Sequence, residues 1–266
     1  MPFGTKAATS PTMFEVAAHL ALLLILAAFF AGFVDSIAGG GGLISIPALL
    51  LAGASPVEAL ATNKLQGTFG SGTAMLAYAR AGQVRPADQW VMASIAAAAG
   101  AGGALVAGLI PVAVLRWIMP VVLIAVAAFF ALKPGLTDQP RPVRMPPAVF
   151  AATLVPAVAA YDGVFGPGAG SFYMLGFVLL AGFGLLQATA HTKMLNFASN
   201  LGSLGIFVLS GDIWWTVGLA MAVAQSCGAA LGARLAVRIG AGLIKPLLVL
   251  VSGAMALRLL WQAVLG

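Results

Sequence analysis

The sequence predicts an all-α integral membrane protein made of two inverted repeats, each with about five hydrophobic segments. Three observations lead to this prediction. The 266 residues are 61% hydrophobic and only 8% charged, which is a composition typical of chains that reside in lipid. Apolar runs recur along the chain at lengths near the roughly 20 residues that a helix needs to cross the hydrocarbon. Two polar motifs each occur twice, in the same order.

The first repeat comprises residues 1–132. Its apolar segments cover residues 14–37, 39–53, 57–80, 87–109 and 112–132. Helices are expected because lipid offers the backbone no hydrogen-bond partners. Segment 39–53 is short for a full crossing and begins with four glycines in "VDSIAGGGGLISIP". Glycine permits a break in the chain, so we expect a half-helix or a re-entrant piece near the membrane midplane.

A polar, proline-rich stretch, "KPGLTDQPRPVRMPP" at residues 133–147, predicts a cytoplasmic linker between the repeats. The second repeat, residues 148–266, is expected to form one integrated transport domain with the first. Its segments begin at the end of the linker and cover residues 147–165, 168–183, 185–210, 213–236 and 241–264. Segment 168–183 is again short, and it follows the broken motif "YDGVFGPGAGSF".

The internal repeat is read from equal spacings. Lys193 follows Lys64 by 129 residues, and Gly103 and Gly232 have the same separation, whereas Asp35 and Asp162 are 127 residues apart. Basic residues change sides between equivalent loops, which predicts opposite orientations of the two halves in the membrane. A parallel repeat with re-entrant short segments is the alternative.

The two glycine motifs are candidate anion sites. A helix that restarts after a break exposes unpaired N–H groups and the positive end of its dipole. Gly40 and Gly41 in the first motif, and Gly168 and Ala169 in the second, are the residues expected to approach a ligand. Tight helix packing by small residues is the alternative role for these glycines.

Two lysines in apolar segments head polar stripes. In "ATNKLQGTFGS" Lys64 shares a helix face with Thr68 and Ser71, and in "AHTKMLNFASN" Lys193 shares one with two asparagines. Symmetry would bring both stripes to one pocket for a small anion, unless the lysines merely extend toward the interface. The full set of candidate substrate-binding residues is Gly40, Gly41, Asn63, Lys64, Gln66, Thr68, Ser71, Gly168, Ala169, His191, Thr192, Lys193, Asn196 and Asn200.

Asp35 and Asp162 are expected to pair with the lysines or to cap the restarted helices, and proton uptake is the alternative. An intramembrane enzyme that uses them as an aspartyl dyad lacks any further catalytic signature. A passive anion channel is a second alternative to a carrier.

Other classes of function have little support. The single Cys227 and two histidines leave no set of metal ligands, and neither a cofactor nor a disulfide within the chain is expected. The net charge of +6 comes from Lys and Arg residues in loops and near helix ends. This placement is typical of residues that set the orientation of a membrane protein, and it does not indicate nucleic-acid binding. No ATP-binding motif occurs. The expected partners are the bilayer and a small anion, with protons as a candidate coupling ion, and a homodimer is left open.

The motifs "GFVDSIAGGGGLISIPALLLAG", "ATNKLQGTFGS", "GPGAGSF" and "AHTKMLNFASN" together resemble the TauE/SafE family of sulfite exporters, over nearly the whole chain from about residue 20. The resemblance implies a multi-pass secondary transporter of the bacterial inner membrane that exports sulfite, sulfoacetate or related sulfonates. Much of the family has a run closer to "GxGGG" where this chain has "GPGAG". The resemblance therefore does not fix sulfite itself as the substrate.

Overall fold

The computed structural model describes residues 18–107 and 137–265, and within these ranges the chain forms helices and no strands. The helices before the linker are α1 (Ala18–Ala38), α2 (Gly42–Leu51), α3 (Pro56–Arg80), the short 3-10 helix η1 (Pro86–Gln89) and α4 (Trp90–Val106). After it come α6 (Pro147–Ala152), α7 (Leu154–Val164), α8 (Ala169–Leu179), α9 (Leu185–Ser210), α10 (Trp215–Ile239) and α11 (Ala241–Leu265). The expected segment 112–132 and the first linker residues, 133–136, lie outside the described residues.

Several helices have the length of membrane spans. Four apolar helical stretches are long enough to cross a bilayer, namely Leu20–Ala38, Pro86–Val106, Pro147–Val164 and Trp215–Ile239. Helices α3 and α9 have 25 and 26 residues, or about 38 and 39 Å at 1.5 Å per residue. They are less apolar because they carry the lysine and asparagine motifs, which lie inside the protein. The chain is therefore a helical, multi-pass membrane protein.

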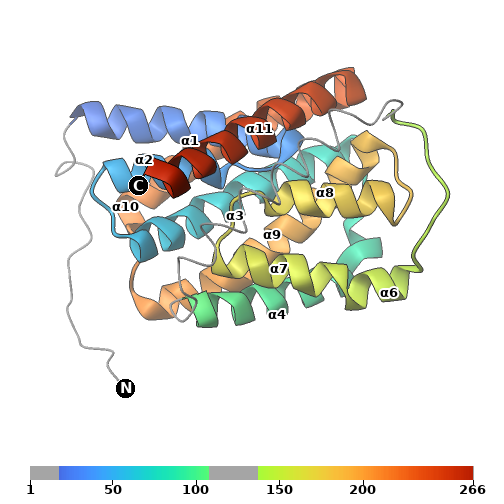
Figure 1. Cartoon of the computed structure of the whole chain (residues 1–266), viewed down its shortest axis with the longest axis horizontal. Coiled ribbons are helices and arrows are strands. Elements are labelled where there is room, and N and C mark those ends of the chain that lie inside the picture. Colours follow the sequence, from blue (N-terminus) through green and yellow to red (C-terminus); the bar gives the residue numbers. More distant parts are fainter. Residues whose placement is uncertain (1–17, 108–136, 266) are drawn as a thin grey trace.

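The helices lie side by side along the long axis of the molecule, so their connections gather at two ends (Figure 1). We call one the linker end. There the Arg141 N–H donates to the Gly182 carbonyl oxygen at 2.7 Å, between the linker and the α8–α9 turn. We call the other the far end. There the first part of α3 contacts the α9–α10 turn, because the Trp214 N–H donates to the Thr62 hydroxyl at 3.1 Å.

Helices α2 and α8 turn back toward the end from which the chain entered (Figure 1). With 10 and 11 residues, or about 15 and 17 Å, neither can cross roughly 30 Å of hydrocarbon. Leu49 near the end of α2 packs with Leu24 near the start of α1. The end of α8 returns to the linker, where the Arg144 N–H donates to the Leu180 carbonyl oxygen at 2.9 Å. Both short helices thus fold back beside the helix that precedes them.

The chain breaks at both glycine motifs, as the sequence predicts. Gly39 and Gly40 have φ angles of 78° and 101°, and Gly166 and Gly168 have φ angles of 88° and 85°. Residues with a Cβ rarely adopt this left-handed backbone conformation, so these positions favour glycine. The turns that they form separate α1 from α2 and α7 from α8.

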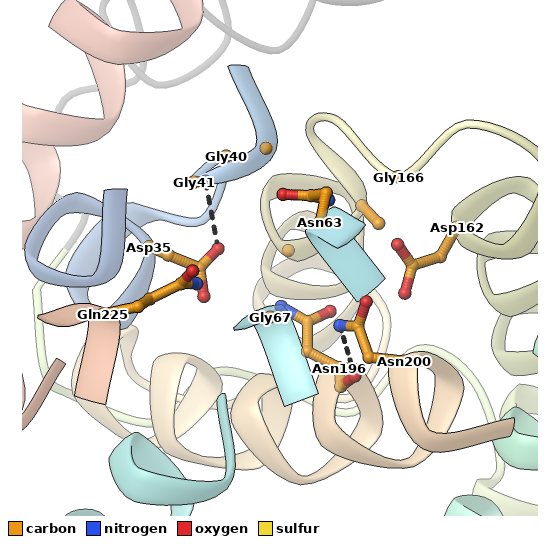
Figure 2. A pocket seen from close by; sticks show the side chains of 13 residues that line it. Asp35, Gly40, Gly41, Asn63, Gly67, Asp162, Gly166, Asn196, Asn200 and Gln225 are labelled. Carbon is orange, nitrogen blue, oxygen red and sulfur yellow. Dashed lines mark hydrogen bonds between the residues drawn. The ribbon is translucent and has the colours of Figure 1, made fainter. Parts of the chain in front are cut away.

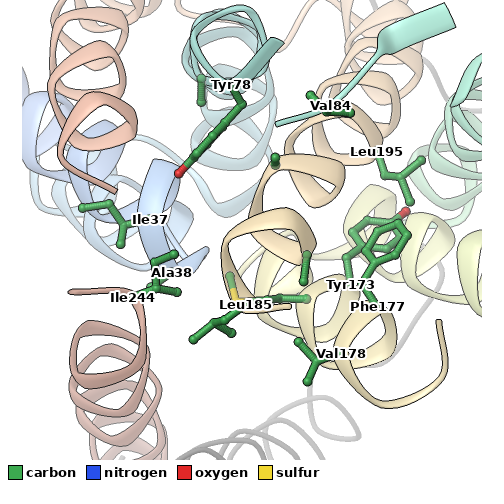
Figure 3. Close-up of a cluster of buried hydrophobic side chains, with 14 of the residues drawn as sticks. Ile37, Ala38, Tyr78, Val84, Tyr173, Phe177, Val178, Leu185, Leu195 and Ile244 are labelled. Carbon is green, nitrogen blue, oxygen red and sulfur yellow. The ribbon is translucent and has the colours of Figure 1, made fainter. Parts of the chain in front are cut away.

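Helices of one half pack on helices of the other. Helix α1 packs against α10, α4 packs against α7, and α3 and α9 contact each other. A buried apolar cluster joins α1, α3, α8, α9 and α11, with Ile37, Tyr78, Tyr173, Leu195 and Ile244 among its members (Figure 3). Folding thus brings segments that are distant in the sequence around a shared centre.

Candidate functional site

A polar pocket lies where the two glycine breaks meet α3 and α9 (Figure 2). The pocket is partly open. Its empty space, including the space at the opening, is about 390 Å³. Apart from six polar side chains, its lining consists of glycine and one alanine. The lining residues are Asp35, Gly40, Gly41, Gly42, Asn63, Gly67, Asp162, Gly166, Ala169, Gly170, Asn196, Asn200 and Gln225.

The two breaks contact each other beside this pocket. A Cβ on Gly39 would lie 2.7 Å from the Ser171 nitrogen, and a Cβ on Gly170 would lie 2.9 Å from the Gly39 Cα. The Ser171 hydroxyl donates to the Ala38 carbonyl oxygen at 3.0 Å. Side chains larger than hydrogen would separate these segments. The first turns of α2 and α8 therefore meet at the pocket.

Two buried ion pairs cross between the halves. Lys64 Nζ lies 2.8 Å from Asp162 Oδ1, and Lys193 Nζ lies 3.1 Å from Asp35 Oδ2. Each ammonium group also donates to the backbone carbonyl oxygen of the same aspartate. Both lysine side chains are fully buried. Of the roles expected for the aspartates, the structure shows pairing with the lysines, and neither lysine side chain reaches the surface.

The aspartates also support the restarted helices. Asp35 Oδ1 accepts a hydrogen bond from the Gly41 N–H at 3.2 Å (Figure 2), so this carboxylate both pairs with a lysine and caps the start of α2. Asp162 Oδ2 accepts a hydrogen bond from the Ser199 hydroxyl on α9. Pairing and capping were separate expectations, and Asp35 combines them.

The charged side chains are not arranged as expected, because the lysines do not face the pocket. Asp35 and Asp162 line it, whereas Lys64 and Lys193 do not. The lysines lie directly behind the lining, because a Cβ on Gly166 would be 3.3 Å from Lys64 Nζ and one on Gly170 would be 3.6 Å from Lys193 Nζ. An unpaired ammonium group is costly away from water, so each one is neutralised by the nearest carboxylate.

Three asparagines supply most of the uncharged polar side chains of the lining, together with Gln225. Asn63 Oδ1 accepts a hydrogen bond from the Ser45 hydroxyl at 2.6 Å, which leaves its NH₂ group to serve as a donor. Asn200 Nδ2 donates to the Asn196 carbonyl oxygen at 2.7 Å (Figure 2). These amides lie between the two carboxylates and can hydrogen-bond a small anion from several directions.

Other predicted site residues do not line the pocket. The hydroxyls of Thr68 and Ser71 donate to carbonyl oxygens of their own helix at 2.7 and 2.6 Å, because a buried hydroxyl on a helix commonly satisfies itself one turn back. His191 packs against the rings of Phe177 and Phe183. The remaining predicted residues lie near the pocket but outside its lining. Gln66 and Thr192 are buried in α3 and α9, and Gly168 is the N-cap of α8, with a left-handed backbone conformation.

The pocket is also lined by residues that the sequence motifs did not indicate as site residues, namely Gln225, Gly42, Gly67, Gly166 and Gly170. Gln225 on α10 is only 3% exposed and lines the pocket. Gln225 could have been recognised from the sequence, because it is the single amide within the apolar run "GLAMAVAQSCGAAL". Among the described residues no group of three or more histidine, cysteine, aspartate or glutamate side chains is placed to hold a metal ion.

Comparisons with known proteins indicate a membrane transporter. Residues 24–259 match the family model described as sulfite exporter TauE/SafE. The probable membrane transporter protein ORF9 of Sinorhizobium sp. is 56% identical over 248 residues, which cover 93% of this chain and 95% of the relative. The probable membrane transporter protein YfcA of Escherichia coli K12 is 44% identical over 255 residues, 96% of this chain and 95% of the relative.

A probable membrane transporter protein of Haemophilus influenzae is 39% identical over 248 residues, covering 93% of this chain and 97% of the relative. No solved structure matches the chain significantly. The relatives align over almost their full lengths, and the matched region includes both glycine motifs and both lysine motifs. The chain therefore belongs to the TauE/SafE family of membrane transporter proteins.

Proposed function

We propose that the protein is a secondary transporter that exports small sulfur-containing anions, such as sulfite, sulfoacetate or related sulfonates, across the bacterial inner membrane. One observation carries this proposal: asparagine amides, two helix starts and two crossed Lys–Asp pairs surround one pocket between the halves. The family description, sulfite exporter, supports the class of substrate.

The pocket suits a small oxyanion. Sulfite and sulfonate groups present three oxygens that each accept hydrogen bonds, and the lining offers amide donors and the first turns of two helices. The lysines behind Gly166 and Gly170 supply positive charge close to the lining. The uncharged donors can discriminate the shape of the anion, whereas each ammonium group can attract it only when the paired carboxylate moves away.

The direction of the central helices supports an inverted repeat. Helices α3 and α9 carry the equivalent lysine motifs, and they run antiparallel. Gly67 of α3 faces Asn200 of α9, whereas Gly72, further along α3, faces Phe197, which is earlier in α9. Equivalent helices of opposite direction are expected when a pseudo-two-fold axis lies in the membrane plane. Rocking of one half against the other would then open the pocket alternately to the two sides.

Export of an anion needs no chemical energy source. In a cell that is negative inside, each negative charge that leaves gains roughly 2.3 kcal/mol per 100 mV of membrane potential. The proposed carrier therefore acts as a uniporter or is coupled to protons.

The test uses the purified protein in liposomes loaded with sulfite, sulfoacetate, sulfate or chloride, at controlled potential and pH. We expect saturable efflux of one or more sulfur-containing anions that accelerates when the interior is negative, and no such flux from protein-free liposomes. Unsaturable efflux with single-channel currents would instead identify a passive anion channel. Lack of flux for every sulfur-containing anion would contradict the proposal.

A further inference from the structure

Two buried amides of the pocket lining have oxygen atoms without a hydrogen-bond partner. Gln225 on α10 and Asn196 on α9 are 3% and 4% exposed, and both line the pocket (Figure 2). Within the part of the chain that the structure describes, neither Gln225 Oε1 nor Asn196 Oδ1 accepts a hydrogen bond. Such buried acceptors are uncommon in native proteins, because each has given up its bonds to water. Their place in the lining indicates that a bound molecule supplies the missing donor.

The fold makes room for the longer of these two amides. A Cβ on Gly70 of α3 would lie 2.7 Å from both Cγ and Nε2 of Gln225, and a Cβ on Gly32 of α1 would lie 2.9 Å from Gln225 Cγ. A larger side chain at either glycine would therefore displace Gln225. Because no hydrogen bond from a described residue holds Oε1, the amide can turn about its last torsion and present this oxygen to the pocket.

The other half of the chain has no equivalent of this amide. The residue aligned with Gln225, 129 positions earlier, is Ala96, and the two glycines that make room for Gln225 correspond to Ala159 and Ser199. Ala96 is buried in α4 and does not line the pocket. The pocket is therefore chemically unequal on its two sides, although the helices around it are repeated. An unequal pocket can distinguish the two ends of a ligand.

We propose that Gln225 is a specificity-determining residue, which selects small sulfonates that carry a hydrogen-bond donor, such as a hydroxyl group, in addition to their negative group. This inference rests on the proposed transport of sulfur-containing anions. A simple oxyanion presents only acceptors, so it can bond the NH₂ group of Gln225 but leaves the amide oxygen unpaired. A hydroxyl group on the same anion donates to that oxygen.

The carboxylates of the lining favour the same kind of ligand. Each carboxylate oxygen of Asp35 and Asp162 accepts one hydrogen bond from the protein and has the capacity for another. An anion without a donor gains nothing from these acceptors, whereas an anion with a hydroxyl group can direct it toward them. The NH₂ group of Asn63 remains for the sulfonate oxygens.

The test compares the binding of two probes, 2-hydroxyethanesulfonate and ethanesulfonate, to the purified full chain. The probes differ by one hydroxyl group, and both are anions of strong acids with the same charge. Wild-type protein should bind the hydroxylated probe about 3- to 10-fold more tightly, which is the range expected for one neutral hydrogen bond. Without an acceptor in the pocket the hydroxyl would lose its bonds to water, and the preference would vanish or reverse.

A pair of matched variants assigns this preference to Gln225. Gln225→Met keeps the length of the side chain but removes its polar atoms, so it should bind the hydroxylated probe no more tightly than ethanesulfonate. Gln89 in η1 is also buried, and its Oε1 also lacks a partner among the described residues, but it does not line the pocket. Gln89→Met should therefore keep the wild-type ratio of affinities.

A second variant covers the case in which methionine does not fit. Gln225→Ala introduces the residue found at the aligned position of the other half, and it should also lose the preference. A preference that persists in either Gln225 variant, or that is lost in Gln89→Met as well, would overturn the inference. An equal loss of affinity for both probes, or failure of both Gln225 variants to fold, would indicate a structural role and would overturn it too.

The wild-type protein provides a further check. Equal affinities for the two probes, or no binding of either, would overturn the inference even where liposomes transport sulfite. Failure of the proposed function itself would appear instead as absence of flux for all sulfur-containing anions.

Discussion

Each buried lysine is held by an aspartate from the other half of the chain, through a carboxylate oxygen and a backbone oxygen. In such a pair the loss of one partner is more costly than the loss of both, because it leaves a buried charge uncompensated. A comparison of single and double substitutions therefore separates the attraction between the two charges from the cost of burying them.

We therefore expect Lys64→Met to destabilise the protein by about 3–5 kcal/mol and to reduce anion flux strongly. The double variant Lys64→Met with Asp162→Leu should regain much of the stability but not the flux. Thermal unfolding in detergent and liposome flux measure the two effects. The exposed pair of Arg85 and Asp88, with side chains 81% and 61% exposed, provides a control, since Arg85→Met should change little. A Lys64→Met protein as stable as the wild type would contradict the role of the pair.

The pocket asparagines should determine which anion is preferred. Removing the Asn63 amide by substitution with Leu deletes a hydrogen bond to a charged ligand, worth about 1.5–3 kcal/mol. We expect a loss of roughly 10- to 100-fold in affinity for the favoured anion, and a change in the ratio of sulfite to sulfate flux. Gln83→Leu, outside the pocket, is the control. Equal flux ratios in Asn63→Leu and wild-type protein would exclude Asn63 from the binding site.

At the scale of helices, glycines set how closely the two halves approach. The aligned residues Gly103 and Gly232 lie against the backbone of the other half. A Cβ at Gly103 would be 2.1 Å from the Ala160 carbonyl oxygen, and one at Gly232 would be 2.5 Å from the Phe33 carbonyl oxygen. These contacts explain why both repeats have glycine at this position.

Gly103→Ala should consequently lower stability, because the α4–α7 backbones would have to separate. Its neighbour Gly102 has nothing within 4 Å of a Cβ position, so Gly102→Ala should be neutral or stabilising by up to about 1 kcal/mol. The comparison of the two unfolding temperatures is the measurement. Equal temperatures for the two variants would mean that α4 and α7 are not in close contact.

One linker residue caps two helices. Asp138 Oδ1 accepts from the Leu186 N–H at 2.9 Å, and Asp138 Oδ2 accepts from the Ala241 N–H at 3.0 Å. The carboxylate thus satisfies the first turns of α9 and α11 together, at the positive ends of both helix dipoles.

Asp138→Ala should cost about 1 kcal/mol per lost cap, or about 2 kcal/mol in total. Asp138→Asn keeps one acceptor oxygen and should lose about half as much. Hydrogen exchange of the amides at the starts of α9 and α11 locates the effect. Unchanged exchange at both helix starts in Asp138→Ala would show that other groups cap these helices.

At the scale of the whole molecule, basic residues gather at the linker end. Segments at this end carry Arg80, Arg85, Arg141, Arg144, Arg238 and Lys245, whereas the α2–α3 and α9–α10 connections at the far end carry the acidic residues Glu58 and Asp212. Cytoplasmic loops of membrane proteins are enriched in lysine and arginine. The linker end is accordingly expected to face the cytoplasm.

Single cysteines can test this orientation. In a Cys227→Ala background, Gln139→Cys at the linker end should be labelled by a membrane-impermeant thiol reagent only after the membrane is opened. Asp212→Cys at the far end should be labelled in intact cells. Labelling of both from the same side would rule out the proposed inverted arrangement.

The sequence by itself was enough to predict the helical membrane class, the breaks at the two glycine motifs and two candidate roles of the aspartates, as partners of the lysines or as helix caps. These features depend on local or compositional physics. A chain that is 61% hydrophobic requires lipid, left-handed turns favour glycine, and a lysine far from water needs a counter-charge. The repeat spacing also aligns Gly103 with Gly232.

Only the tertiary structure decided which groups face the pocket. Spacing placed Lys64, Thr68 and Ser71 on one helix face, but it could not show that the lysine is covered by Asp162 and that the hydroxyls bond their own backbone. It likewise could not bring Gln225 of α10 to the site. The physical reason is that exposure within a bundle depends on which neighbouring helix covers each face, and those neighbours come from the other half of the chain.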